Sequence, residues 1–138
     1  MDATAWSTIV SELTHPDVST CVNAAARLHA EAGAEDVPKL LEILKSNDFF
    51  VREAAAWPLA ELAGPRALTE LLHAYQRSFD EGHDNDGFSA ALLEILAFHP
   101  QDTRSSRERI VGTAEEPMRG HAVWLLGFCE SRLGSGDA

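Results

Sequence analysis

Apolar side chains recur along the chain at the three- and four-residue spacing of an α-helix. Within residues 35–46, Val37, Leu40, Leu41 and Leu44 lie at positions i, i+3, i+4 and i+7, which share one helical face. Strand-like alternation and hairpin dipeptides are scarce. The pattern therefore predicts an all-α chain with eight helices, over residues 4–14, 18–32, 35–46, 49–63, 65–79, 86–98, 103–113 and 116–132.

The predicted helices come in pairs, and successive pairs resemble one another. Residues 24–33 match residues 55–64, 31 positions later, at alanine, leucine and glycine, and Trp57 recurs 67 positions later as Trp124. A repeat of about 30 residues built from two helices is typical of an α-solenoid. We therefore predict one domain, with units of about 1–33, 34–64, 65–99 and 100–133 and a flexible tail at 134–138.

Residues 36–48 and 51–59 together resemble a HEAT repeat, most closely the short bacterial variety first noted in phycobilisome lyases. Asp48 at the turn and Arg52 early in the second helix are similar to the acidic and basic positions that this family pairs. The resemblance implies a right-handed α-α superhelix of about four helix pairs, whose second helices line the concave side. It supplies no catalytic residue, because the repeat motif is structural.

A row of large apolar side chains is expected along that concave side. In the helix over 49–63, Glu53, Ala56, Trp57 and Ala60 are predicted to point away from the interhelical core, and Ala54 toward it. The repeat offsets place Ala26, Leu93 and Trp124 at positions equivalent to Trp57, and Leu92, Leu96 and Val123 would extend the row.

An exposed apolar strip commonly marks an interface, and tryptophan is enriched among binding hot spots. The alternative is that Trp57 and Trp124 fill space between repeats as ordinary core. Pro58 is expected to kink its helix, because proline removes a backbone hydrogen bond. Trp6 is expected to pack as a cap on the first unit.

The charge balance narrows the class of partner. Eleven basic and 22 acidic residues give a net charge of −11, and residues 1–100 carry 16 of the acids but only six of the bases. Duplex nucleic acid and anionic membranes are disfavoured, since both need a positive footprint. A basic protein would be attracted, although acidity could also serve solubility alone. Acids expected beside the apolar row are Glu53, Glu61, Asp84 and Asp86.

Residues 78–87 form a predicted acidic insertion between two helices, with His83 at its centre. A helix-loop-helix calcium site is excluded, because Gly82 and Leu93 would occupy positions that require acids. A transition-metal site at His83, Asp84 and Asp86 stays open, as do a solvated loop and recognition of a basic partner. No bound metal or cofactor is predicted.

Enzymatic motifs are absent from the sequence: it has no phosphate-binding glycine loop, nucleophile elbow or histidine-pair zinc motif. Cys21 and Cys129 are interpreted as structural thiols, and the basic run over 104–109 as a solvated helix face. No secretory signal or membrane span is evident, so a cytoplasmic location is expected.

These features predict a non-enzymatic protein-binding module that uses its concave face to bind a basic protein. The chain would act as a monomer or in a heterocomplex that depends on its partner. The sharpest version is an immunity protein that neutralises a toxin. The alternatives are a tetrapyrrole-handling factor of the lyase type and a general assembly adaptor.

Overall fold

The structure is a computed structural model, and it describes residues 1–84, 86–99, 101–102, 105 and 108. This part of the chain forms helices and no strand. The elements are α1 (Ala3–Leu13), α2 (Val18–Glu31), the 3-10 turn η1 (Ala34–Asp36), α3 (Val37–Ile43), α4 (Phe49–Leu62), the 3-10 turn η2 (Gly64–Ala67), α5 (Leu68–Asp80) and α6 (Asp86–Phe98). The predicted helices over 103–113 and 116–132, with Val123, Trp124 and Cys129, lie outside the described residues.

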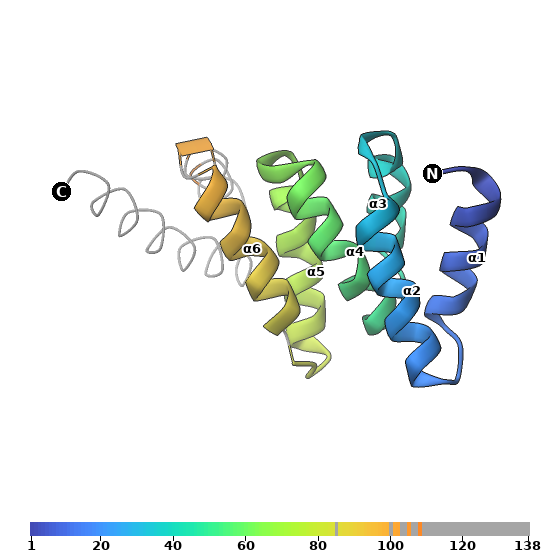
Figure 1. The fold of residues 1–138 in the computed structure, drawn as a ribbon. Coiled ribbons are helices and arrows are strands. Elements are labelled where there is room, and N and C mark those ends of the chain that lie inside the picture. The colour runs from blue at the N-terminus through green and yellow to red at the C-terminus, as the bar shows by residue number, and fades with distance from the viewer. Residues whose placement is uncertain (85, 100, 103–104, 106–107, 109–138) are drawn as a thin grey trace.

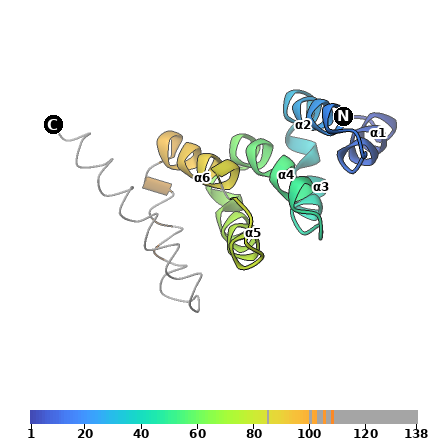
Figure 2. The same cartoon turned by 90° about the horizontal axis from the view of Figure 1, so that it is seen from below.

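The helices stack as consecutive pairs, from α1 and α2 at one end to α5 and α6 at the other (Figure 1). Viewed from below, the second helices α2, α4 and α6 form one row, and α3 and α5 lie behind it (Figure 2). Within the front row, α4 packs against α2 on one side and α6 on the other. The prediction of an α-solenoid is therefore confirmed.

Aspartate side chains fix the start of three helices. Asp2, Asp17 and Asp48 each occupy the N-cap, and their carboxylates accept hydrogen bonds from backbone N–H groups in the first turns of α1, α2 and α4. Such caps satisfy amides that have no partner within the helix. For this reason α2 and α4 start at the predicted residues, 18 and 49.

The first helices of the second and third units differ from the prediction at their starts. The expected helices over 35–46 and 65–79 each begin as a 3-10 turn and become α-helical only at Val37 and Leu68. Pro38 and Pro65 stand at the second positions of α3 and η2, within the first turn, where the missing N–H needs no partner. After Ile43, the backbone N–H groups of Lys45 and Ser46 donate to carbonyl oxygens three residues earlier, as in a 3-10 turn. Helix α3 is therefore shorter than predicted.

Helix α4 is the centre of the core. Ala56 and Ala60, expected to point outward, are buried, whereas Ala54, expected in the core, is half-buried at the surface. The cause is that α4 packs against α2, α3, α5 and α6, so only a narrow stripe of its surface remains uncovered. Leu92, expected in the exposed row, is fully buried as well.

One buried guanidinium joins the second unit to the third. Arg52 is fully buried; it donates to the carbonyl oxygens of Ser46 and Asn47, to the Ser78 hydroxyl at 3.2 Å and to the Glu81 carboxylate. The Arg52 hydrogen bond is the main reason that the pKa of the Glu81 carboxyl is lowered. The acidic partner of Arg52 is therefore Glu81 of the next unit, whereas Asp48 acts as a helix cap.

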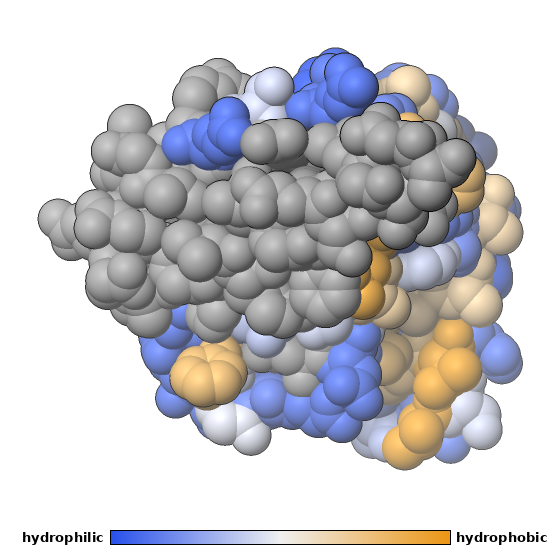
Figure 3. Space-filling model, turned by 90° about the vertical axis from the view of Figure 1, so that its left-hand side faces the viewer, coloured by the Kyte–Doolittle hydropathy of each residue, from blue (hydrophilic) through white to orange (hydrophobic). Residues whose placement is uncertain are grey.

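At the α6 end of the stack, hydrophilic and hydrophobic residues are interspersed over the described surface (Figure 3). Among the side chains that the structure describes on these two helices, Phe79 on α5 and Phe98 on α6 are the large apolar ones that are exposed. Within the part of the chain that the structure describes, no helix combines the length and apolarity needed to cross a bilayer.

Candidate functional site

The exposed stripes of α2, α4 and α6 come together on the front row of helices. On α2 the stripe contains Val18 and Val22, which are 73% and 52% exposed, followed one and two turns later by Ala26 and His29. Helical spacing places these residues on one side of α2. We call the combined surface of α2, α4 and α6 the second-helix face.

A hollow of about 330 Å³ lies at the centre of the second-helix face, and we call it the central hollow. Its wall along α4 is aromatic and acidic, with Phe50, Glu53 and Trp57 at successive turns. Small side chains from α2 and α6 leave the space open. The lining residues are Ala25, Ala26, His29, Phe50, Glu53, Ala54, Trp57, Pro58, Gly87 and Ala90.

Trp57 is half-buried, so it is neither a fully exposed interface residue nor a fully buried core residue, the two alternatives that the sequence left open. Its ring lines the central hollow and also packs against the core beneath it. The His29 ring meets it edge to face, with 6.1 Å between the ring centroids. Pro58 lies within α4 without ending the helix, and it forms part of the same wall.

Glu53 is held against the start of α6. A Cβ atom added to Gly87 would lie 2.8 Å from the carboxyl carbon of Glu53, so the glycine permits this close approach. Partial burial, and then the nearby carboxylates of Asp84 and Asp86, raise the pKa of Glu53. No other described residue forms an ion pair or hydrogen bond with the Glu53 carboxylate. The site therefore holds a partly desolvated acid that lacks a described counter-charge.

A second acidic group lies beyond Trp57 on the same face. Glu61, one turn after Trp57, lies beside His29, with 3.0 Å between the His29 Nε2 and the Glu61 Oε1. Glu94 on α6 is half-buried, and burial, followed by repulsion from Glu61, raises the pKa of its carboxyl. Trp57 is thus flanked along α4 by carboxylates on both sides.

The turn between α5 and α6 is shorter than the predicted insertion. Residues 78–80 belong to α5 and residues 86–87 to α6, because Arg52 and Arg77 hold Glu81 at the end of α5. His83 stacks on Phe49, with 4.3 Å between ring centroids. Among the described residues, no three potential ligand side chains converge on a metal site.

The structure brings together some of the predicted site residues and separates others. Glu53 and Trp57 line the central hollow, Glu61 lies one turn away, and Asp84 and Asp86 act on Glu53 through their charge. Leu93 is half-buried against the core, and α6 contributes Ala90 to the hollow.

Several residues of the face were missed by the sequence reasoning. Phe50 could have been found, since it lies seven residues before Trp57 on the same stripe of α4. Val18 and Val22 also share a helical stripe. The contribution of Glu94 and Gly87, by contrast, depends on how α6 packs against α4, which no local pattern reveals.

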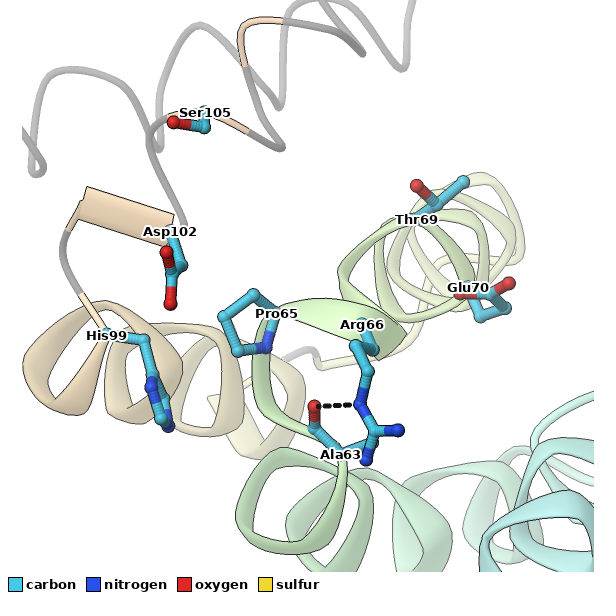
Figure 4. Close-up of a pocket in the computed structure, with 8 residues that line it drawn as sticks. All are labelled: Ala63, Pro65, Arg66, Thr69, Glu70, His99, Asp102 and Ser105. Atoms are coloured by element: carbon cyan, nitrogen blue, oxygen red, sulfur yellow. Dashed lines mark hydrogen bonds between the residues drawn. The ribbon is translucent and has the colours of Figure 1, made fainter.

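A larger hollow of about 700 Å³ lies where α4 ends and α5 begins (Figure 4). Arg66 folds back, so that its Nε donates to the Ala63 carbonyl oxygen at 3.4 Å, while Thr69 and Glu70 project from α5. The His99 ring packs against Gly64, whose φ of +56° suits glycine. Parts of the neighbouring segment lie outside the described residues, and no site is assigned to this hollow.

The stacked helix pairs and the continuous surface of their second helices define an α-solenoid repeat protein. A scan against protein-family models matches HEAT repeats over residues 7–83, which is more than half of the chain. The chain belongs to the HEAT repeat family. Comparisons with curated proteins and with solved structures gave no match. HEAT repeats are commonly protein-interaction modules and are generally non-enzymatic scaffolds.

Proposed function

We propose that this protein binds a basic protein through the second-helix face. The supporting observation is the central hollow, in which Trp57 is flanked by Glu53 and Glu61 on a chain of net charge −11. The half-buried Trp57 on α4 and the exposed valines on α2 offer apolar contact area on the same face, and tryptophan is frequent among hot spots. The surrounding carboxylates favour a cationic surface and repel an acidic one.

A toxin-neutralising immunity protein is the most specific form of this proposal. Small size and strong acidity support it, because an inhibitor of a basic enzyme gains both speed and selectivity from an opposite charge. A general assembly adaptor would use the same face with a different partner. The two differ in whether the bound protein loses an activity.

Affinity capture from the native cell tests the proposed face. The tagged wild type is compared with Trp57→Ala and Glu61→Lys, and with Glu42→Lys on α3 as a charge-matched control outside the face. Glu42 is exposed and has only a surface ion pair with Lys45. Circular dichroism verifies that each variant is folded. We expect a basic protein bound by wild type and Glu42→Lys and lost from the other two. Equal retention by all four would refute the proposal.

A further inference from the structure

We propose that the central hollow receives an arginine side chain of the partner, with its guanidinium beside the Glu53 carboxylate and against the ring of Trp57. This inference rests on the proposed function and specifies the chemistry of its anchor. It commits to one occupant, an arginine in a basic segment of the partner protein.

The order of residues along α4 supports a cation at this point. Phe50, Glu53 and Trp57 follow one another at intervals of one turn, so the carboxylate lies between two aromatic side chains. Aromatic faces attract cations, and a carboxylate accepts hydrogen bonds from them. The aromatic rings and the Glu53 carboxylate would therefore bind the same guanidinium group.

The volume and lining of the hollow fit one extended side chain. About 330 Å³ is at the small end of the range of about 300–1,000 Å³ for ligand pockets. Ala26 and Ala90, on opposite sides of α4, are exposed and too small to fill the space. The aliphatic stem of an arginine would pass over these methyl groups, while its head reaches the acid.

Charge complementarity selects a cation over a neutral apolar group. Glu53 has Asp84 and Asp86 as neighbouring charges, and no described residue neutralises it. A guanidinium would relieve this repulsion and replace lost hydration with direct hydrogen bonds. An apolar occupant would instead complete the burial of an unpaired carboxylate, which costs free energy.

The same chain already holds a guanidinium in such surroundings. Arg52 ion-pairs with Glu81, and its Cζ lies 5.8 Å from the centroid of the Phe49 ring. Arginine suits this combination better than lysine, because its planar group stacks on rings and forms forked contacts with carboxylates.

Peptide titration of the full chain tests this inference. The probe is the blocked pentapeptide Gly-Ser-Arg-Ser-Gly, compared with versions that carry lysine or the uncharged isostere citrulline at its centre. The readout is the indole N–H signal of Trp57 in nuclear magnetic resonance spectra, assigned with Trp57→Phe. We expect the arginine peptide to shift this signal and the citrulline peptide to bind at least about tenfold more weakly.

Two pairs of variants distinguish binding in the central hollow from nonspecific attraction by the net negative charge of the protein. Glu53→Gln and Glu42→Gln remove the same charge, inside and outside the hollow. Ala90→Leu fills the hollow, and Ala30→Leu adds the same volume on an exposed part of α2 that does not line it. We expect the inner variant of each pair to weaken the arginine peptide by at least about fivefold and the outer one by less than about twofold.

The outcomes separate this inference from the proposed function. Equal weakening by Glu53→Gln and Glu42→Gln, or equal binding of the arginine and citrulline peptides, would overturn the arginine pocket. No peptide-induced shift of the Trp57 signal would overturn it as well. The proposed function would still stand if Trp57→Ala and Glu61→Lys lost the captured basic protein.

Discussion

Arg52 connects two units of the array with a single side chain. Its guanidinium bonds backward to the turn before α4 and forward to Ser78 and Glu81 at the end of α5. Cys21, the residue 31 positions earlier, makes only a thiol hydrogen bond to the His15 carbonyl in the first unit. At this position the first unit therefore has no equivalent of the charged link that Arg52 forms between the second and third units.

Replacing Arg52 with methionine should destabilise the protein by about 2–3 kcal/mol, because carbonyl oxygens and Glu81 lose a charged donor. Urea denaturation monitored by circular dichroism measures this loss. Arg27→Met is the control, because Arg27 forms exposed ion pairs with Glu12 and Glu31 and should cost less than about 1 kcal/mol. Equal losses in the two variants would contradict the role of Arg52.

The difference in unfolding free energy between wild type and Arg52→Met should become smaller at acid pH. Arg52 lowers the pKa of Glu81 in the folded state, so the pair stabilises the fold above the ordinary pKa of a glutamate. That contribution is lost as the pH falls through the lowered pKa. Denaturation at pH 7 and pH 3 tests this, and a gap that widens at low pH would show that Glu81 is not the partner that matters.

The pKa of Glu53 is shifted in the opposite direction from that of Glu81, so its ionisation should have the opposite effect on stability. Burial and the charges of Asp84 and Asp86 raise its pKa, so its ionised form opposes folding at neutral pH. Glu53→Gln should therefore stabilise the protein at pH 7 by about 0.5 kcal/mol, with the gain shrinking as the pH falls through the raised pKa. Thermal denaturation across this range measures it. A loss of stability at pH 7 would mean that Glu53 has a favourable partner in the fold.

At the scale of the helices, α4 is the element around which the described part is built. It packs between α2 and α6 and also against α3, whereas α1 packs chiefly against α2. In a repeat array each unit is stabilised mainly by its neighbours, so an end helix opens more easily than a central one.

Native-state hydrogen exchange should resolve this difference. We expect amides of α4 to exchange only through the global unfolding of the chain, and those of α1 to open at a free energy lower by about 2 kcal/mol or more. Leu59→Ala, in the centre of α4, serves as the comparison, since it should lower the protection of the α4 amides while the local opening of α1 changes little. Equal protection of α1 and α4 would contradict the central role of α4.

Helix positions followed from the sequence because their determinants are local. Asp17 and Asp48 mark the starts of α2 and α4 by capping amides a few residues away. Burial is not local in this sense. Ala56 and Ala60 lie off the main apolar stripe of α4, yet they are buried because neighbouring helices cover several sides of it.

The candidate site was predictable only in part, because some of its residues are related by spacing within one helix and others by packing between helices. Trp57, Glu53 and Glu61 could be placed on one face of a helix from their spacing alone. The hollow beside them exists because Ala26 and Ala90 happen to face it from two other helices. The partner of Arg52 lies 29 residues ahead, at Glu81, and no spacing within one helix pair points to it.

At the scale of the whole molecule, the charge of −11 acts over longer distances than any single contact. A basic protein would experience this field before it touches Trp57. Long-range attraction raises the rate of association, whereas buried contacts control the rate of dissociation.

Association with the captured basic protein should therefore slow with salt. We expect the association rate to fall by about tenfold or more between about 50 and 500 mM NaCl, while the dissociation rate changes little. Surface plasmon resonance measures both rates. Trp57→Ala should show the converse pattern, with a faster dissociation and the same salt dependence of association. An association rate independent of salt would eliminate electrostatic steering.

Site-specific photocrosslinking tests most directly whether partners bind the second-helix face. A photoreactive residue is placed at Ala26 or Ala90, on the rim of the central hollow, and at Glu42 or His73, exposed positions on α3 and α5. In the native cell, we expect covalent capture of a basic protein from the first two positions and not from the second two. Capture only from Glu42 and His73 would show that the protein binds its partners with its other side.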